Sequence, residues 1–201
     1  MRMSNSPRLL LIILGTSLMT AFAASAQPPR TPPPGQLDVA LTYSTSHSNF
    51  VPGSDFWLQG GDLEFAFHLP ARFSGVASLS GGHTGPGTGG VPLSVINELY
   101  GPRYTWTFPG KTHDVSIFGQ GLVGITEGFG STFPASGAAT TSASGLAVQA
   151  GGGLDVGLSR HWQVRACEVQ WLRSQLPNNT TNVQNSLKIG AGLVFRFQAI
   201  R

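Results

Sequence analysis

The segment HDVS, His113 to Ser116, places a histidine, a carboxylate and a hydroxyl side by side. A hydrolase needs these three groups within hydrogen-bonding reach of one another, as base, orienting acid and nucleophile. Adjacent side chains of a strand point to opposite faces, so His113 and Asp114 cannot share one side of it. The 5 histidines have no metal-ligand spacing. We therefore expect no enzyme activity, no catalytic residues, no metal site and no cofactor.

A second kind of polar site is a buried ionic cluster. Buried cations are tolerated in a protein when carboxylates pair with them. Three further carboxylates, Asp38, Glu64 and Asp155, are available as partners. The candidate members of the cluster are Glu98, Arg103, Arg165, Glu168, Lys188 and Arg196.

The composition indicates which surroundings the chain favours. Only 10% of its 201 residues are charged, against about 25% in ordinary soluble domains, while the hydrophobic fraction is 40%. Much of the surface is therefore expected not to face water. The net charge is +3 without a Lys/Arg cluster, so no nucleic-acid partner is expected. Cys167 is the single cysteine and cannot form an intrachain disulfide.

Period-two alternation of apolar and polar residues predicts eight β-strands and no amphipathic helix. Each run has about 11 to 15 residues, whereas globular strands average about 5 or 6. A tilted membrane-spanning strand needs about 9 to 11 residues. The predicted strands are 36–46, 55–69, 72–82, 95–108, 113–126, 145–158, 161–172 and 186–197.

The predicted connections alternate strictly between short and long. Transmembrane barrels have this pattern, with short periplasmic turns and long outer loops. The short connections are 69–72, 109–112 and 159–160, and the long ones are 47–54, 83–94, 127–144 and 174–184.

The last strand shows the two faces most clearly. Leu187, Ile189, Leu193, Phe195 and Phe197 alternate with cations and glycines. A barrel in lipid turns its apolar face outward, whereas a soluble barrel with the same alternation turns it inward. The low charge, the strand length and the aromatic residues near strand ends favour lipid. The predicted fold is therefore an all-β, eight-stranded, antiparallel, up-and-down transmembrane β-barrel.

An eight-stranded barrel has an interior that side chains can fill. Inward glycines, among them Gly151, Gly153, Gly190 and Gly192, would leave room for longer inner side chains. We expect a plugged lumen. Two positions break the alternation: Pro102 in YGPR predicts a bulge, and Arg165 and Glu168 can both point inward only if a bulge lies between them.

The N-terminal segment is typical of a secretory signal. A polar start with Arg2 and Arg8 precedes an apolar run of about 14 residues, shorter than the roughly 18 of a spanning helix, and small residues follow up to Ala26. We expect residues 1–26 to be a signal peptide cleaved near Ala26, 27–35 a proline-rich spacer, 36–197 the barrel and 198–201 a tail.

The ending with Gly192, Phe195 and Phe197 is similar to the signal that the barrel-assembly machinery recognises. LYGPRYTW, Leu99 to Trp106, is similar to the FGPR strand of small outer-membrane barrels. With its signal segment and alternating strands, residues 36–197 resemble outer-membrane β-barrel proteins of the OmpA/OmpX type. The resemblance implies the bacterial outer membrane as location, its lipid and lipopolysaccharide as surroundings, and the assembly machinery as a partner.

The fold hosts many functions, so the resemblance leaves the role open. The first alternative is a non-enzymatic structural or surface-interaction barrel that uses its outer loops, such as residues 126–144. The second is a narrow or gated solute channel or a lipid-binding barrel. The third is a soluble ligand-binding barrel. The sequence identifies no extracellular partner.

Overall fold

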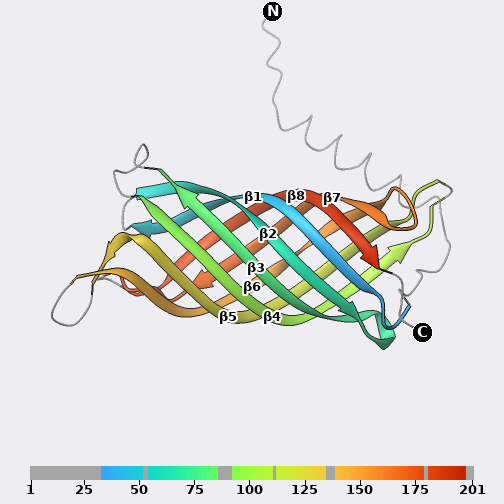
Figure 1. The fold of residues 1–201 in the computed structure, drawn as a ribbon, viewed down its shortest axis with the longest axis horizontal. Helices are drawn as coiled ribbons and strands as arrows, with labels where there is room; N and C mark the ends of the chain where they lie inside the picture. The colour runs from blue at the N-terminus through green and yellow to red at the C-terminus, as the bar shows by residue number, and fades with distance from the viewer. Residues whose placement is uncertain are drawn as a thin grey trace, which may run out of the picture.

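The computed structural model describes residues 33–51, 54–85, 92–110, 112–134, 139–178 and 181–197. Within them, eight strands form a closed barrel in which each pairs antiparallel with the next and the last pairs with the first (Figure 1). The predicted all-β, eight-stranded up-and-down fold is confirmed. The strands are β1 (Leu37–Val51), β2 (Ser54–His68), β3 (Phe73–Thr84), β4 (Leu93–Phe108), β5 (Val115–Phe133), β6 (Thr140–Gly157), β7 (Trp162–Ser174) and β8 (Gln184–Phe197).

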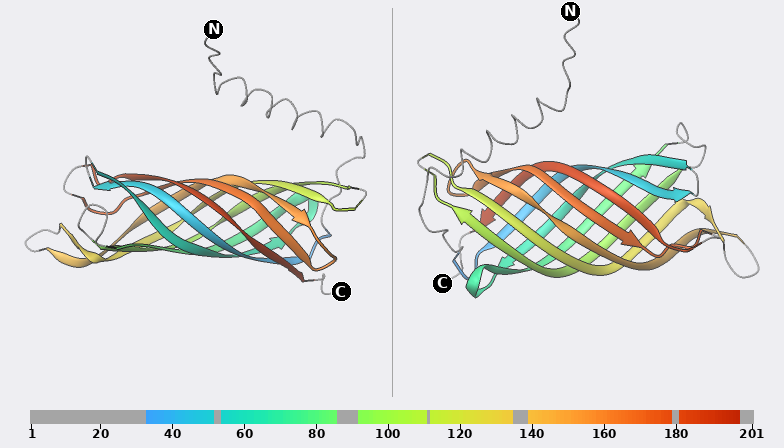
Figure 2. Two further views of the ribbon diagram at one scale, coloured as in Figure 1. Left: turned by 90° about the horizontal axis from the view of Figure 1, so that it is seen from above. Right: turned by 180° about the vertical axis from the view of Figure 1, so that it is seen from behind.

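The two ends of the barrel differ, as the views in Figure 2 show. At the turn end, β2 is joined to β3 by a 3-10 turn, η1 (Pro70–Arg72), and residues 158–161 join β6 to β7. At the hairpin end, β5 and β6 project beyond the other strands (Figure 1). No helix in the described part of the chain is long and apolar enough to cross a bilayer.

The predicted strict alternation of connection lengths is wrong, because two of the predicted long loops are mostly strand. β1 and β2 are separated by residues 52–53 alone, and β5 and β6 pair as far as Phe133 and Thr140. The extra pairing in the β5–β6 hairpin uses small residues, such as Gly128 with Ala143. Small side chains on both faces leave no apolar alternation, so the sequence pattern missed these strand ends.

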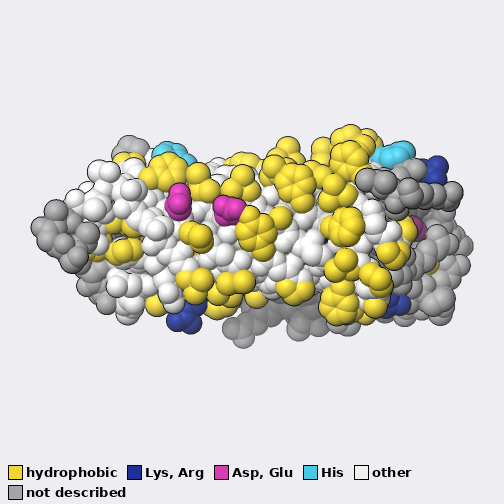
Figure 3. All heavy atoms as spheres, turned by 60° about the horizontal axis from the view of Figure 1, so that its bottom comes forward, with side chains coloured by type: hydrophobic (Ala, Val, Ile, Leu, Met, Phe, Trp, Pro, Cys, Tyr) yellow, Lys and Arg dark blue, Asp and Glu magenta, His cyan; other side chains and the backbone are white. Residues whose placement is uncertain are grey.

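Alternation along β8 divides its residues between the two faces of the wall. Leu187, Ile189 and Leu193 are exposed on the outside, whereas Lys188 and Val194 are buried inside. The opposite assignment, with the apolar stripe lining the interior, is therefore wrong. In Figure 3, apolar side chains cover much of the barrel wall and charged groups are sparse.

The predicted bulge in β7 is present. The register shifts between Arg165 and Glu168, both against β6 and against β8, so Ala166 and Cys167 are exposed and the two charged residues both point inward. The predicted bulge in β4 at Pro102 is wrong. The pairing of β4 with β3 and with β5 keeps one register across Pro102. The ladder between β4 and β5 lacks only the pairs at Gly101 and Pro102, where proline has no N–H to donate.

The predicted signal segment 1–26 and the tail 198–201 lie outside the described residues, as does most of the spacer 27–35. Of the spacer, Gly35 donates a backbone hydrogen bond to the His68 carbonyl at the turn end. The described strands run from Leu37 to Phe197.

Candidate functional site

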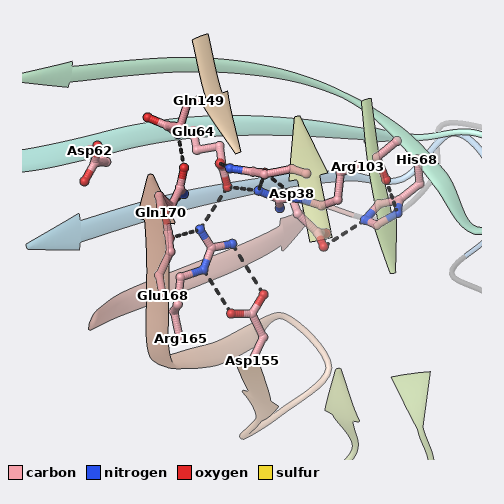
Figure 4. A network of polar contacts seen from close by, with 12 residues as sticks. Asp38, Asp62, Glu64, His68, Arg103, Gln149, Asp155, Arg165, Glu168 and Gln170 are labelled. Carbon is pink, nitrogen blue, oxygen red and sulfur yellow. Dashed lines mark hydrogen bonds and ion pairs between the residues drawn. The ribbon is translucent and has the colours of Figure 1, made fainter. Parts of the chain in front are cut away.

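An ion network crosses the lumen between strands that are not neighbours in the wall (Figure 4). Glu64 of β2 is paired with Arg103 of β4 and with Arg165 of β7, the latter at 2.9 Å. Gln120 of β5 accepts a hydrogen bond from Arg103 and donates one to Glu64. Because β2, β4, β5 and β7 are all joined by these contacts, the network ties opposite sides of the barrel together.

Arg165 is the centre of this network, and its side chain is only 1% exposed. Besides Glu64, it contacts Asp155 with its Nε atom at 3.0 Å and Glu168 with a terminal nitrogen at 2.7 Å. Glu168 also accepts a hydrogen bond from Gln170, which in turn accepts one from Gln149. A single buried guanidinium therefore contacts three carboxylates, and Arg103 contacts one of them, Glu64.

The ring of Phe118 lies between the two arginines of the network. The guanidinium carbon of Arg103 lies 4.0 Å and that of Arg165 lies 4.5 Å from the ring centroid. A desolvated cation–π contact of this kind contributes on the order of 2 kcal/mol. Gly153 of β6 leaves the space that the ring occupies, since a Cβ atom there would lie 2.8 Å from Phe118. The predicted role of this inward glycine is thus confirmed.

This contact makes a testable prediction. Gly153→Ala should destabilise the barrel by about 1–3 kcal/mol, because overpacking forces both Phe118 and the adjacent backbone of β7 to move. Urea unfolding of the folded barrel in detergent measures the change. The matched control is Gly75→Ala, where a Cβ atom meets nothing within 4 Å. Equal stability of the two variants would contradict the packing role of Gly153.

Two further ion pairs lie on either side of the network. Toward the hairpin end, Lys188 of β8 contacts Asp62 of β2 at 2.5 Å. At the turn end, Asp38 accepts hydrogen bonds from Gln36 and His68, and Arg196 lies 3.5 Å from it. Arg196 is 27% exposed and so lies at the mouth of the lumen.

The structure places the predicted cluster residues in different sites. Arg103, Arg165 and Glu168 meet in the network, whereas Lys188 and Arg196 form separate pairs. The prediction that Glu98 joins them is wrong. Without a bulge at Pro102, simple alternation puts Arg103 inside and Glu98 outside, where it is exposed and accepts a hydrogen bond from the Tyr100 hydroxyl.

Sequence reasoning left several members out of the predicted cluster. The sequence predicted Glu64 and Asp155 as available partners in the lumen, where both are buried, but it did not count them among the members of the cluster. Asp62, the partner of Lys188, lies two positions before Glu64 and so has the same inner placement by alternation. Gln120 also lies on the face opposite to Ile117 and Val123, but the predicted cluster contained only charged residues.

A small chamber lies beyond Lys188, toward the hairpin end. Its volume is about 50 Å³, enough for a few water molecules. Four apolar side chains, Leu58, Leu93, Phe133 and Leu176, pack together at its outer side. Gln184 holds Leu176 there by bonding both its backbone N–H and its carbonyl. The hydroxyls lining the chamber belong to Ser44, Ser46, Ser48, Ser80, Ser174 and Ser186.

The residues of the HDVS segment do not contact one another as a catalytic set would. His113 bonds the Gly157 carbonyl at 2.7 Å, and Asp114 accepts a bond from the Gly110 N–H at 3.2 Å. Ser116 bonds Thr107 at 2.9 Å. Among the described residues, no group of histidine, cysteine and acidic side chains has a geometry that could hold a metal ion.

The residues of the predicted assembly signal lie at the turn end of β8. The rings of Phe195 and Phe197 are 4.7 Å apart, and Trp162 lies 4.9 Å from Phe195. Tyr104 and Trp106 of β4 form a second pair of rings, with centroids 4.5 Å apart. A Cβ atom at Gly192 would lie 2.1 Å from the Leu41 carbonyl oxygen, so this position accepts no side chain without a shift of backbone.

Comparison with known proteins places this barrel among outer-membrane barrels by fold. No protein-family model matches the chain, and no curated protein matches it. Ail, the attachment invasion locus protein of Yersinia pestis, matches with a TM-score of 0.53 and 17% identity over 82% of this chain and 100% of Ail. Neisserial surface protein A matches with a TM-score of 0.61 and 9% identity, over 81% of this chain and 99% of that protein. OprG from Pseudomonas aeruginosa matches with a TM-score of 0.50 and 11% identity, over 84% of this chain and 99% of OprG.

At these identities the likeness shows the fold alone. The chain has the closed eight-stranded antiparallel barrel of these outer-membrane proteins. The resemblance to small outer-membrane barrels that the sequence indicated is confirmed at this level.

Proposed function

We propose that this chain is a non-enzymatic integral barrel of the bacterial outer membrane with a side-chain-filled lumen, and that it acts through its hairpin end. The observation that carries the proposal is the distribution of polarity across the wall. Apolar side chains such as Leu41, Ile189 and Leu193 are exposed outside, while the charged residues of the ion network are buried inside. Water would favour the reverse arrangement, and lipid favours this one.

The aromatic residues at the turn end support a membrane boundary there. Phe73, Tyr104 and Trp106 of two adjacent strands, and Trp162, Phe195 and Phe197 of two others, form ring contacts around this end. Aromatic rings are enriched at the level of lipid headgroups. We infer that the turn end faces the periplasm, and that residues 1–26 are a signal peptide that directs export. Lipopolysaccharide would then surround the hairpin end, and the assembly machinery would recognise the end of β8.

The projecting β5–β6 hairpin supports a contact role. It extends past the neighbouring strands, and its exposed residues from Thr140 to Ser142 carry no charge (Figure 1). Backbone groups of such a hairpin are free to pair with a partner. Ail was solved in complex with the heparin analogue sucrose octasulfate, which supports an extracellular contact role for a barrel of this fold.

A narrow or gated channel is the second candidate, and the serine-lined chamber favours it. The chamber is separated from the turn end by the ion network and from the hairpin end by the apolar cluster around Phe133. Conduction would require both layers to rearrange.

Three measurements test the proposal together. Mature protein should fractionate with the outer membrane, migrate faster on a detergent gel before heating than after, and give no conductance steps in planar bilayers, since the ion network fills the lumen. Regular steps would favour the channel. A protein soluble without detergent would overturn the membrane assignment.

A further inference from the structure

One carboxylate stands out on the apolar outer wall. Glu98 is exposed in β4 between Ile96 and Tyr100, and its neighbours across the sheet are Leu79 of β3 and Ile125 of β5. All four neighbours are exposed apolar or aromatic side chains. Of the outward-facing strand residues whose side chains the structure describes, the charged ones are Glu98, Glu127 and Arg173.

An ionisable residue facing lipid is costly and marks a functional contact whose partner should be sought. Within the described chain, Glu98 has one partner, the Tyr100 hydroxyl, which reaches its Oε1 atom. Its Oε2 atom remains available. Arg173 is the outward-facing cation of the described strands, and it lies at the hairpin end of β7, next to the last strand residue Ser174.

The register shows how rows of paired residues climb around the tilted barrel. One row starts at Val39 on β1 and reaches Asn185 on β8. The next residue, Ser186, pairs with Ser48 of β1, so the row returns to β1 close to Ser48, nearer the hairpin end than where it started. Each circuit from β1 toward β8 therefore rises toward the hairpin end. The row passes through Phe65, Ala77, Tyr100, Val123, Val148 and Arg173.

This row fixes the relative levels of Glu98 and Arg173 in a membrane. From Tyr100 on β4 to Arg173 on β7 the row crosses three strand spacings. For strands about 4.8 Å apart and tilted about 40°, Arg173 therefore lies about 9 Å nearer the hairpin end than Tyr100, measured along the barrel axis. Glu98 lies two positions from Tyr100 toward the hairpin end of β4. With the same tilt, it is about 5 Å nearer the hairpin end than Tyr100 along the barrel axis. The two charges thus lie within about 4 Å of the same level, a difference that an arginine side chain spans.

Each of the two charges also has an exposed aromatic ring on its turn-end side. On β4, Tyr100 is exposed two positions from Glu98 toward the turn end. On β7, Trp171 is exposed two positions before Arg173 and on the same face. The two faces therefore present a charge and an aromatic ring in the same order along the membrane normal.

We propose that copies of this chain associate side by side in the membrane, with Arg173 of one copy paired to Glu98 of the next. The inference rests on the proposed function, because insertion in one orientation is what brings equal levels of neighbouring barrels together. The β4 face and the β7 face are different patches, so the contact is heterologous and can repeat from copy to copy. Trp171 then lies beside Tyr100 of the next copy.

Cysteine cross-linking tests the pair directly. In a Cys167→Ser background, which removes the exposed free thiol, two tagged copies carry Glu98→Cys and Arg173→Cys respectively. Oxidation in outer membranes should yield a disulfide-linked heterodimer, and neither variant alone should yield a homodimer. The matched control replaces Glu98→Cys by Thr45→Cys, on the outer face of β1 at about the same level as Glu98, and should give at least tenfold less product. No heterodimer, or as much from the control, would overturn the proposal.

A charge reversal gives a second, independent readout. Energy transfer between labelled copies in lipopolysaccharide-containing vesicles should fall at least threefold for Glu98→Arg and recover in the variant that combines Glu98→Arg with Arg173→Glu. If recovery fails and magnesium chelation alone abolishes the signal of the unmodified chain, a cation-bridged lipid contact replaces the self-contact. All variants should remain heat-modifiable and membrane-bound. Loss of those properties in the unmodified chain would instead contradict the proposed function.

Discussion

Arg165→Met should destabilise the folded barrel by about 3–5 kcal/mol, the largest effect expected of any single substitution in the lumen. The buried guanidinium contacts Glu64, Asp155 and Glu168 at distances between 2.7 and 3.0 Å. Its removal leaves Asp155 and Glu168 buried without a cation in contact, and it also removes one of the two cations stacked on Phe118. Methionine fills similar volume, so the effect reports charge rather than a cavity.

Urea unfolding in detergent micelles, followed by tryptophan fluorescence, measures this loss. Arg160→Met is the matched control, because Arg160 is exposed in the β6–β7 turn and its replacement should change the unfolding free energy by less than about 0.5 kcal/mol. Adding Glu168→Gln to Arg165→Met should recover part of the stability, since one uncompensated carboxylate is then gone. Equal stability of the two arginine variants would mean that the network carries little energy.

Leu41→Arg should destabilise the barrel by about 2–4 kcal/mol in lipid, because a cation near the middle of the apolar belt loses its hydration. Leu41 is 67% exposed on the outer wall. It pairs with Leu63 and Leu193, whose side chains share its face. The same substitution on a barrel surrounded by water would be nearly neutral.

Folding into phospholipid vesicles at graded urea concentrations gives this number. Leu158→Arg is the control, since Leu158 is exposed at the turn end, where a cation reaches the headgroup region and should cost about 0–1 kcal/mol. A smaller loss for Leu41→Arg than for Leu158→Arg would contradict the proposed lipid-facing wall.

The comparison of β4 with β7 shows where the alternation argument works and where it fails. In β7, the inward placement of both Arg165 and Glu168 requires an added residue, and the register shift supplies it. In β4, Pro102 suggested the same device, yet the strand passes it in register, because a missing N–H costs one ladder bond and does not require an insertion. That difference decided the face of Glu98.

The sequence by itself determined the strand count, the closed antiparallel fold and the two faces of the wall, because side chains of a strand alternate with a period of two and each face favours one kind of residue. It also placed Arg103 and Lys188 on the inner face, and it left the inward placement of both Arg165 and Glu168 conditional on a bulge. The tertiary structure alone decided the partners. Arg165 reaches Glu64 across the lumen although 101 positions separate them, and Phe118 lies between two arginines from different strands. Such contacts depend on barrel closure and on the register of every intervening pair of strands, which no local pattern encodes.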